Sequence, residues 1–176
     1  MLNRFFLEKI SDNFPFSFTD DQLAALEHIS DFLFSGMNDQ IFLLTGYAGT
    51  GKSSLIGSLV KTMAAFDQKT LLLAPTGRAA KVFSTYASHP AYTIHKKIYR
   101  QEKFGEGTVH FSLSENLHTH TLFIVDEASM IYNESADNSL FGTGRLLDDL
   151  IEYVYGAEGC RMLLIGDNAQ LPPVKQ

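Results

Sequence analysis

Residues 46–53 read Gly-Tyr-Ala-Gly-Thr-Gly-Lys-Ser and fit the pattern G-x-x-x-x-G-K-[ST], which is typical of loops that bind phosphate groups. Backbone N–H groups of such a loop and of the helix that follows it have no partner within the helix and point at an anion. Lys52 would reach the β- and γ-phosphates of a nucleoside triphosphate, and the Ser53 hydroxyl would ligate Mg²⁺. The alternative is a glycine turn with a helix-capping serine. The residues expected at the nucleotide are Gly46, Ala48, Gly49, Thr50, Gly51, Lys52, Ser53 and Ser54.

A strand and a helix must hold this loop. Residues 41–45 form an apolar run of strand length before it, and apolar residues recur at helical spacing after it. Three further apolar runs, at residues 70–74, 121–125 and 162–165, alternate with helical patterns. This alternation predicts βαβ units, and therefore an α/β fold with a parallel sheet and helices on both faces. In such folds, ligands bind at the carboxyl ends of the strands.

Two carboxylates follow the run at residues 121–125 directly. Asp126 would hold Mg²⁺, which prefers oxygen ligands and keeps several waters. Glu127 would accept a proton from a water that attacks the γ-phosphate. The alternative is an acidic pair that caps a helix at an exposed turn, but the phosphate loop favours the catalytic interpretation. Gln170 follows the last run and would hydrogen-bond the γ-phosphate or the attacking water, or else only cap a turn.

Gln22 allows two structural interpretations. Thr19 is expected to begin a helix, and as the third helical residue Gln22 would complete a capping box with it. Its side-chain amide can also donate to and accept from an adenine edge, because it carries both kinds of group. The residues alone leave both roles open.

The composition is that of an ordinary globular domain, with 45% hydrophobic and 19% charged residues among 176. The one cysteine, Cys160, favours a reducing compartment. No apolar run approaches the length of a membrane span, and residues 1–15 do not form a signal peptide. We therefore expect a cytoplasmic protein that has no membrane partner.

Basic residues are concentrated in one part of an acidic chain whose net charge is −6. Residues 78–103 contain six lysines and arginines against one glutamate, a local charge of +5, so the rest of the chain carries −11. We call this segment the basic stripe. Its aromatic residues are Phe83, Tyr86, Tyr92 and Tyr99. Lysines and arginines can bind phosphates while aromatic rings stack on bases, so this mixture suits single-stranded nucleic acid. The alternative is that most of these rings belong to the hydrophobic core.

Taken together, the motifs at the ends of the expected strands resemble those of superfamily 1B DNA helicases, whose motor domains are P-loop NTPases. Residues 18–174 are similar to the first RecA-like motor domain of this family, and most similar to its RecD-like branch. Residues 18–22 look like its adenine-reading glutamine motif, which favours the adenine role of Gln22. Residues 46–53 are similar to motif I and residues 125–130 to motif II. Residues 166–173 resemble motif III, which links nucleotide state to DNA.

The same resemblance implies where single-stranded DNA would bind. Residues 74–80 are similar to motif Ia, and residues 93–95 match a Thr-Ile-His that lies on the DNA side in this branch. The implied DNA contacts are Pro75, Thr76, Gly77, Arg78, Thr93, His95 and Lys96.

The resemblance implies an ATP-dependent DNA helicase or translocase that uses ATP and Mg²⁺ in DNA repair or recombination, similar to the exodeoxyribonuclease V alpha subunit. Its catalytic residues would be Lys52, Glu127 and Gln170. Residues 1–17 would be an extension, and a short insertion at about residues 101–120 would lie where the family has a small subdomain that carries a strand-separating pin. Such helicases also need a second RecA-like domain, which this chain lacks, so the chain alone is expected to be nearly inactive. The alternative is a nucleotide-gated DNA-binding module without motor activity.

Overall fold

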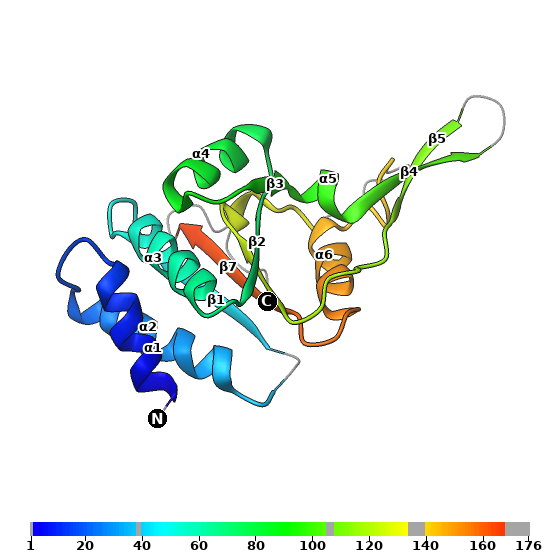
Figure 1. Cartoon of the computed structure of the whole chain (residues 1–176). Helices are drawn as coiled ribbons and strands as arrows, with labels where there is room; N and C mark the ends of the chain where they lie inside the picture. Colours follow the sequence, from blue (N-terminus) through cyan, green and yellow to red (C-terminus); the bar gives the residue numbers. More distant parts are fainter. Residues whose placement is uncertain (1, 38–39, 105–107, 134–139, 168–176) are drawn as a thin grey trace, which may run out of the picture.

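A five-stranded sheet runs through the centre of the computed structural model, which describes residues 2–37, 40–104, 108–133 and 140–167 (Figure 1). In spatial order its strands are β1 (Ile41–Gly46), β7 (Arg161–Asp167), β6 (Thr121–Val125), β2 (Lys69–Ala74) and β3 (Ala91–Thr93). Every neighbouring pair in this sheet is parallel. The predicted α/β fold of a P-loop NTPase, with a RecA-like parallel sheet, is confirmed.

Alternate residues of β6 enter two separate cores, because successive side chains of a strand point to opposite faces of the sheet. Leu122 and Ile124 belong to the first core, and Phe123 and Val125 to the second. The helices of the first core are α1 (Leu2–Asn13), α2 (Asp20–Phe34), α3 (Lys52–Ala65) and α4 (Gly77–Ala87). Those of the second are α5 (Ile94–Ile98) and α6 (Leu146–Tyr155). Helices therefore cover both faces, as predicted.

The N-terminal helix α1 is packed into the first core. Phe6 and Ile10 are buried there, and the side chain of Asn13 donates to Thr62 on α3 over 3.0 Å. Residues 1–17, expected to be an extension, thus supply a helix that packs against the same core as α2 and α3.

Strand β1 lies at one edge of the sheet, and its apolar run is only half covered. Leu44 faces the first core and is 8% exposed, whereas Leu43 and Ile41 are 53% and 40% exposed. The apolar pattern predicted a strand here correctly. It did not reveal an edge strand with one open face, because the run reads like that of β6, which is buried throughout.

A two-stranded antiparallel hairpin extends from the body of the molecule (Figure 1). It consists of β4 (Tyr99–Phe104) and β5 (Thr108–Leu113), and it lies where an insertion was expected at about residues 101–120. Phe111 of β5 forms a bridge with Phe141, and the two rings stack at 4.5 Å. The short 3₁₀ helix η1 (Ala128–Met130) follows β6. Within the described ranges, no helix has the length and apolar character required to cross a bilayer.

Candidate functional site

A cavity of about 400 Å³ opens at the carboxyl ends of β1, β6 and β7, and we call it the loop cleft. Its lining residues are Ala48, Gly49, Thr50, Gly51, Lys52, Ser53, Val82, Tyr86, Asp126, Glu127, Ile165, Gly166 and Asp167. The phosphate loop and the two carboxylates, which lie more than seventy positions apart in the sequence, thus line one cavity. This is the place at which ligands bind in open α/β sheets.

Two glycines shape the loop between β1 and α3. Gly49 and Gly51 have φ angles of +80° and +84°, in the left-handed region that favours glycine. A Cβ on Gly51 would also lie 2.5 Å from Nε2 of Gln22. The left-handed backbone therefore favours glycine at position 51, a larger residue there would displace the Gln22 amide, and α3 begins at the next residue.

Lys52 is held over the loop that precedes it. Its Nζ donates to the carbonyl oxygens of Gly46 and Tyr47, over 2.6 and 2.8 Å. An ammonium group carries three donors, so the position of Lys52 on the cleft wall is compatible with a phosphate contact in addition to the two loop carbonyls. Gly46 thus helps to orient Lys52 through its carbonyl, without lining the cavity.

Gln22 forms the predicted capping box and also contacts the phosphate loop. Its Oε1 accepts from the Thr19 N–H over 3.1 Å, and the Thr19 hydroxyl accepts from the Gln22 N–H over 3.3 Å. Its Nε2 donates to the carbonyl of Thr50 over 3.0 Å. The structural role is confirmed, and the adenine-reading role stays a prediction.

One other expected residue, Ser54, does not line the cavity. Ser54 follows Ser53 on α3, and one helical step turns its side chain about 100° away from the cleft. Gln170 lies outside the described residues.

The carboxylate of Asp126 is fixed at both oxygens. Its Oδ1 accepts from the Glu127 N–H over 2.9 Å, and its Oδ2 accepts from the Tyr86 hydroxyl over 2.7 Å. Burial raises the pKa of Tyr86, and the neighbouring Asp126 raises it further, so the phenol keeps its proton and donates. Ser53 and Asp126 offer hydroxyl and carboxylate oxygens to the same cavity, and this donor set fits Mg²⁺.

Glu127 has an unusual backbone conformation beside this carboxylate. Its φ and ψ are 54° and 39°, the left-handed region, which costs energy for a residue other than glycine and is common at functional sites. Burial raises the pKa of the Glu127 carboxyl, as do the negative charges of Asp126 and Asp167, while Lys52 opposes the shift. A carboxylate with a raised pKa is a better proton acceptor.

A second cavity of about 350 Å³ adjoins the loop cleft, and we call it the α4 groove. Its lining residues are Thr76, Arg78, Ala79, Val82, Asp126, Glu127 and Met130. Val82, Asp126 and Glu127 line both cavities. The expected DNA contacts Thr76 and Arg78 therefore lie beside the carboxylates of the loop cleft.

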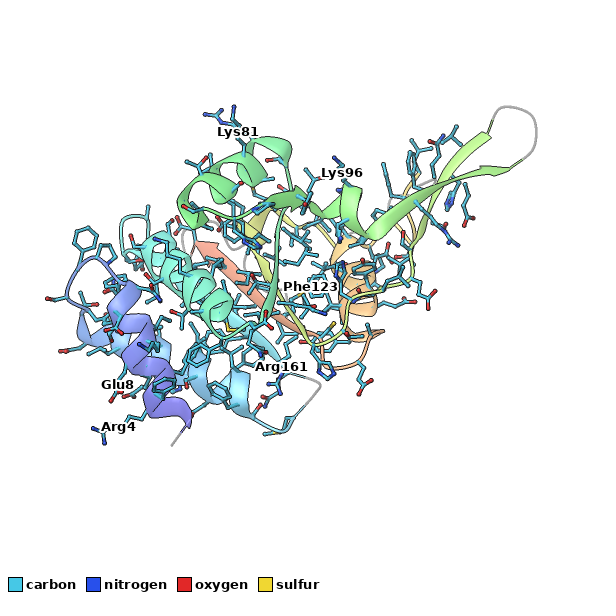
Figure 2. All side chains as sticks on the ribbon, in the orientation of Figure 1. Arg4, Glu8, Lys81, Lys96, Phe123 and Arg161 are labelled. Carbon is cyan, nitrogen blue, oxygen red and sulfur yellow. The ribbon has the colours of Figure 1, made fainter. Side chains whose placement is uncertain are left out.

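Two of the expected DNA contacts cap helices, and most of the remaining ones are exposed. Thr76 and Thr93 cap α4 and α5, each hydroxyl accepting from a backbone N–H three residues on. Gly77, Arg78 and Lys96 are exposed, and Pro75 is half-buried at the end of β2. Lys81 on α4 and Lys96 on α5 project from the same edge of the molecule (Figure 2).

His95 is turned toward a hydrophobic cluster. Its ring packs edge-on against Phe141 at 5.0 Å and lies 5.7 Å from Tyr99, and burial lowers its pKa. This is the arrangement expected of a histidine that ties two elements together. Its DNA role stays a prediction with less geometric support than that of Lys96.

Most rings of the basic stripe belong to the interior, as the alternative interpretation held. Phe83 and Tyr99 are buried, and Tyr86 donates to Asp126. Tyr92 is 41% exposed, with Nζ of Lys97 lying 5.8 Å from its ring centroid. Of these four rings, Tyr92 has the accessible face that a base would need.

Sequence reasoning missed Val82, Tyr86 and Ile165 as residues of the loop cleft. Val82 and Tyr86 are four positions apart on α4, and residues with this spacing share one face of a helix. That spacing was the available signal. The contact partner Asp126 is forty positions from Tyr86 and could not be identified from it.

Comparisons with known proteins identify the family of this chain. A family model described as an AAA domain matches residues 17–176. The ATP-dependent RecD2 DNA helicase of Deinococcus radiodurans is 32% identical over 157 residues, which cover 89% of this chain and 18% of that protein. An uncharacterized protein of Methanocaldococcus jannaschii is 30% identical over 161 residues, covering 85% of this chain and 13% of its own length. The chain thus spans less than a fifth of these curated relatives.

A solved structure supports the fold. The crystal structure of Pif1 helicase from Candida albicans matches with a TM-score of 0.53 and 20% identity, over 91% of this chain and 34% of that one. At this identity the likeness concerns the fold alone. The family match shows that this chain belongs to the AAA domain family, and the RecD2 and Pif1 comparisons support a RecA-like domain of the superfamily 1 helicase type.

Proposed function

We propose that this chain binds ATP with Mg²⁺ in the loop cleft, binds single-stranded DNA along α4 and α5, and hydrolyses ATP as one half of a DNA helicase or translocase motor. The observation that carries the proposal is the convergence of Lys52, Asp126 and Glu127 on one cavity with the phosphate loop. A glycine turn with a capping serine would not require two carboxylates from another strand in its wall.

Triphosphate binding rests on the loop and on the N-terminus of α3. The backbone N–H groups at the start of this helix have no partner within it, and the helix dipole favours an anion there. Lys52 adds a positive charge that the loop carbonyls already orient. Because the lysine is oriented in advance, less side-chain freedom is lost on binding.

Ser53 and Asp126 would hold Mg²⁺, which supplies charge neutralisation at the β- and γ-phosphates. Asp126 is oriented for this by its two hydrogen bonds. Glu127 would accept the proton of the attacking water, since its carboxylate lines the same cavity. Gln22 would read the adenine edge from its place on the loop, and Gln170 would contact the γ-phosphate or the attacking water.

DNA binding rests on exposed cations next to the nucleotide. Arg78 and Lys96 are exposed, and Arg78 lines the α4 groove with Asp126 and Glu127. Because a metal ion and a nucleotide at these carboxylates would adjoin the same groove, nucleotide state and strand binding would influence each other. The surface that binds the DNA strand would also include Thr76, Gly77, Tyr92 and Thr93.

A second RecA-like domain would complete the motor by supplying an arginine for the γ-phosphate. No arginine is found among the described residues that line the loop cleft. The RecD resemblance implies 5′-to-3′ polarity and work in DNA repair or recombination, and the composition favours a cytoplasmic location.

The test uses the 176-residue chain and Lys52→Ala, with Lys61→Ala as a matched control on the exposed side of the same helix. Isothermal titration with AMP-PNP and Mg²⁺ should detect binding by the wild type and by Lys61→Ala. We expect no detectable binding by Lys52→Ala, with an unchanged melting curve. Equal affinities in all three chains would refute the nucleotide site.

A further inference from the structure

The hydrogen bond between Tyr86 and Asp126 joins the nucleotide site to the helix that begins the basic stripe. The Tyr86 hydroxyl donates to Oδ2 of Asp126 over 2.7 Å, and the two residues lie forty positions apart. Oδ1 of the same carboxylate accepts from the Glu127 N–H. One donor on each oxygen fixes both the rotation and the tilt of the carboxylate.

Tyr86 is itself held firmly. Its ring stacks on Phe83 with centroids 5.0 Å apart, and Phe83 is fully buried. The backbone of α4 also lies close to α3 here, since a Cβ on Gly57 would lie 3.1 Å from the Tyr86 carbonyl oxygen. The hydroxyl therefore projects from a ring that stacks on the buried Phe83, at the point where α4 packs closely on α3.

The hydrogen bond from Tyr86 matters because Asp126 lines the loop cleft at the point where Mg²⁺ would bind. A carboxylate oxygen can accept more than one hydrogen bond or metal contact, so a bond to Tyr86 leaves acceptor capacity toward the cleft. Residues that hydrogen-bond to metal ligands orient those ligands, and replacing such residues typically weakens metal binding strongly although they do not contact the metal.

We infer that Tyr86 is a positioning residue, which holds Asp126 in the orientation that binds the magnesium ion of the nucleotide. The inference rests on the proposed function and deepens it. Tyr86 acts only through Asp126, and α4 thereby carries both the exposed Arg78 and the group that orients the metal carboxylate.

The discriminating variant is Tyr86→Phe, which keeps the ring, its stacking on Phe83 and the approach of α3, and removes only the hydroxyl. Tyr132→Phe is the matched control, because the Tyr132 side chain is 77% exposed. AMP-PNP binding would be measured by isothermal titration in EDTA and at increasing MgCl₂ concentrations, with melting curves for each chain.

We expect Tyr86→Phe to bind AMP-PNP in EDTA as the wild type does, since the loop and Lys52 are unchanged. The MgCl₂ concentration for half-maximal tightening should rise by about 10- to 100-fold, the usual effect of removing such an outer partner. Tyr132→Phe should match the wild type. A residue needed only for packing would shift the melting temperature and leave the magnesium dependence unchanged.

A double-mutant cycle with Asp126→Asn tests whether Tyr86 acts through that carboxylate. In the Asp126→Asn chain, adding Tyr86→Phe should change the magnesium dependence no further. Additive effects, or a wild-type magnesium dependence for Tyr86→Phe, would overturn the inference. A wild-type chain without magnesium-dependent nucleotide binding would instead overturn the proposed function.

Discussion

The hydroxyl of Tyr99 donates to the carboxylate of Asp149 over 2.6 Å, and this contact fastens the base of the projecting hairpin to helix α6. Asp149 is only 1% exposed. Its carboxylate also accepts from the backbone N–H and the hydroxyl of Thr143. A buried carboxylate needs such donors, because leaving it without partners costs several kcal/mol.

Tyr99→Phe should therefore destabilise the chain. The variant removes one of two donors to Oδ2 of Asp149, a loss that typically costs about 1–3 kcal/mol. For a chain of this size each 1 kcal/mol lowers the melting temperature by about 2–4 °C. Urea denaturation and thermal melting would measure it, with the exposed Tyr132→Phe as the control. Equal stability of the two variants would mean that water replaces the phenol.

Glu127→Gln should separate ATP binding from hydrolysis. The amide keeps the size of the side chain but cannot accept a proton, and loss of a general base commonly costs about 10²- to 10⁴-fold in rate. The measurement is phosphate release at saturating DNA, in a protein that carries this chain and a second motor domain. Glu152→Gln on the exposed surface of α6 is the control. Turnover within a few-fold of wild type would exclude Glu127 as the base.

Much of the fold could be predicted from the sequence because buried parallel strands are continuous apolar runs. This holds for β2, β6 and β7, whose residues are largely buried. The prediction was incomplete for β1, because an apolar run does not show whether a helix covers both faces of the strand. The three-residue strand β3 was too short for any pattern.

The site was predictable where its residues are neighbours in the chain, as in the phosphate loop and Asp126 with Glu127. Contacts between distant residues were not. The Tyr86–Asp126 and Tyr99–Asp149 bonds span 40 and 50 positions, and no local spacing encodes them. The aromatic residues near lysines also suggested a surface that binds single-stranded DNA, although Phe83 and Tyr99 are buried in the protein core.

Arg78 and Lys96 should contribute to single-strand binding through phosphate contacts. Replacing both with alanine should weaken binding of an oligo(dT) strand and flatten its salt dependence. The slope of log K against log salt should fall by about 0.7 for each lost contact. Arg4→Ala with Lys9→Ala is the matched control, since it removes the same two side-chain types from α1, and Figure 2 shows Arg4 far from Lys81. If the salt dependence of the double variant equalled that of this control, single-stranded DNA would bind to another face of the protein.

The chain by itself should bind ATP weakly, hydrolyse it very slowly and unwind nothing. The loop cleft holds the phosphate loop, Lys52 and the carboxylates, but no arginine is among the described residues of its wall. In comparable phosphoryl-transfer sites an arginine from a facing domain contributes about 10³- to 10⁵-fold in rate. That is roughly 4–7 kcal/mol of the barrier. A cleft open to water also weakens the remaining electrostatic contacts, because the local dielectric constant is high.

Steady-state phosphate release checks this expectation, measured with and without single-stranded DNA for the 176-residue chain and for a protein that also carries a second motor domain. We expect DNA to stimulate the longer protein and to leave the short chain near its basal rate. Lys52→Ala in each protein gives the background. If the short chain showed DNA-stimulated turnover at the longer protein's rate, the arginine argument would be wrong. In that case Arg78, which lines the adjoining α4 groove, or a second copy of the chain would have to complete the site.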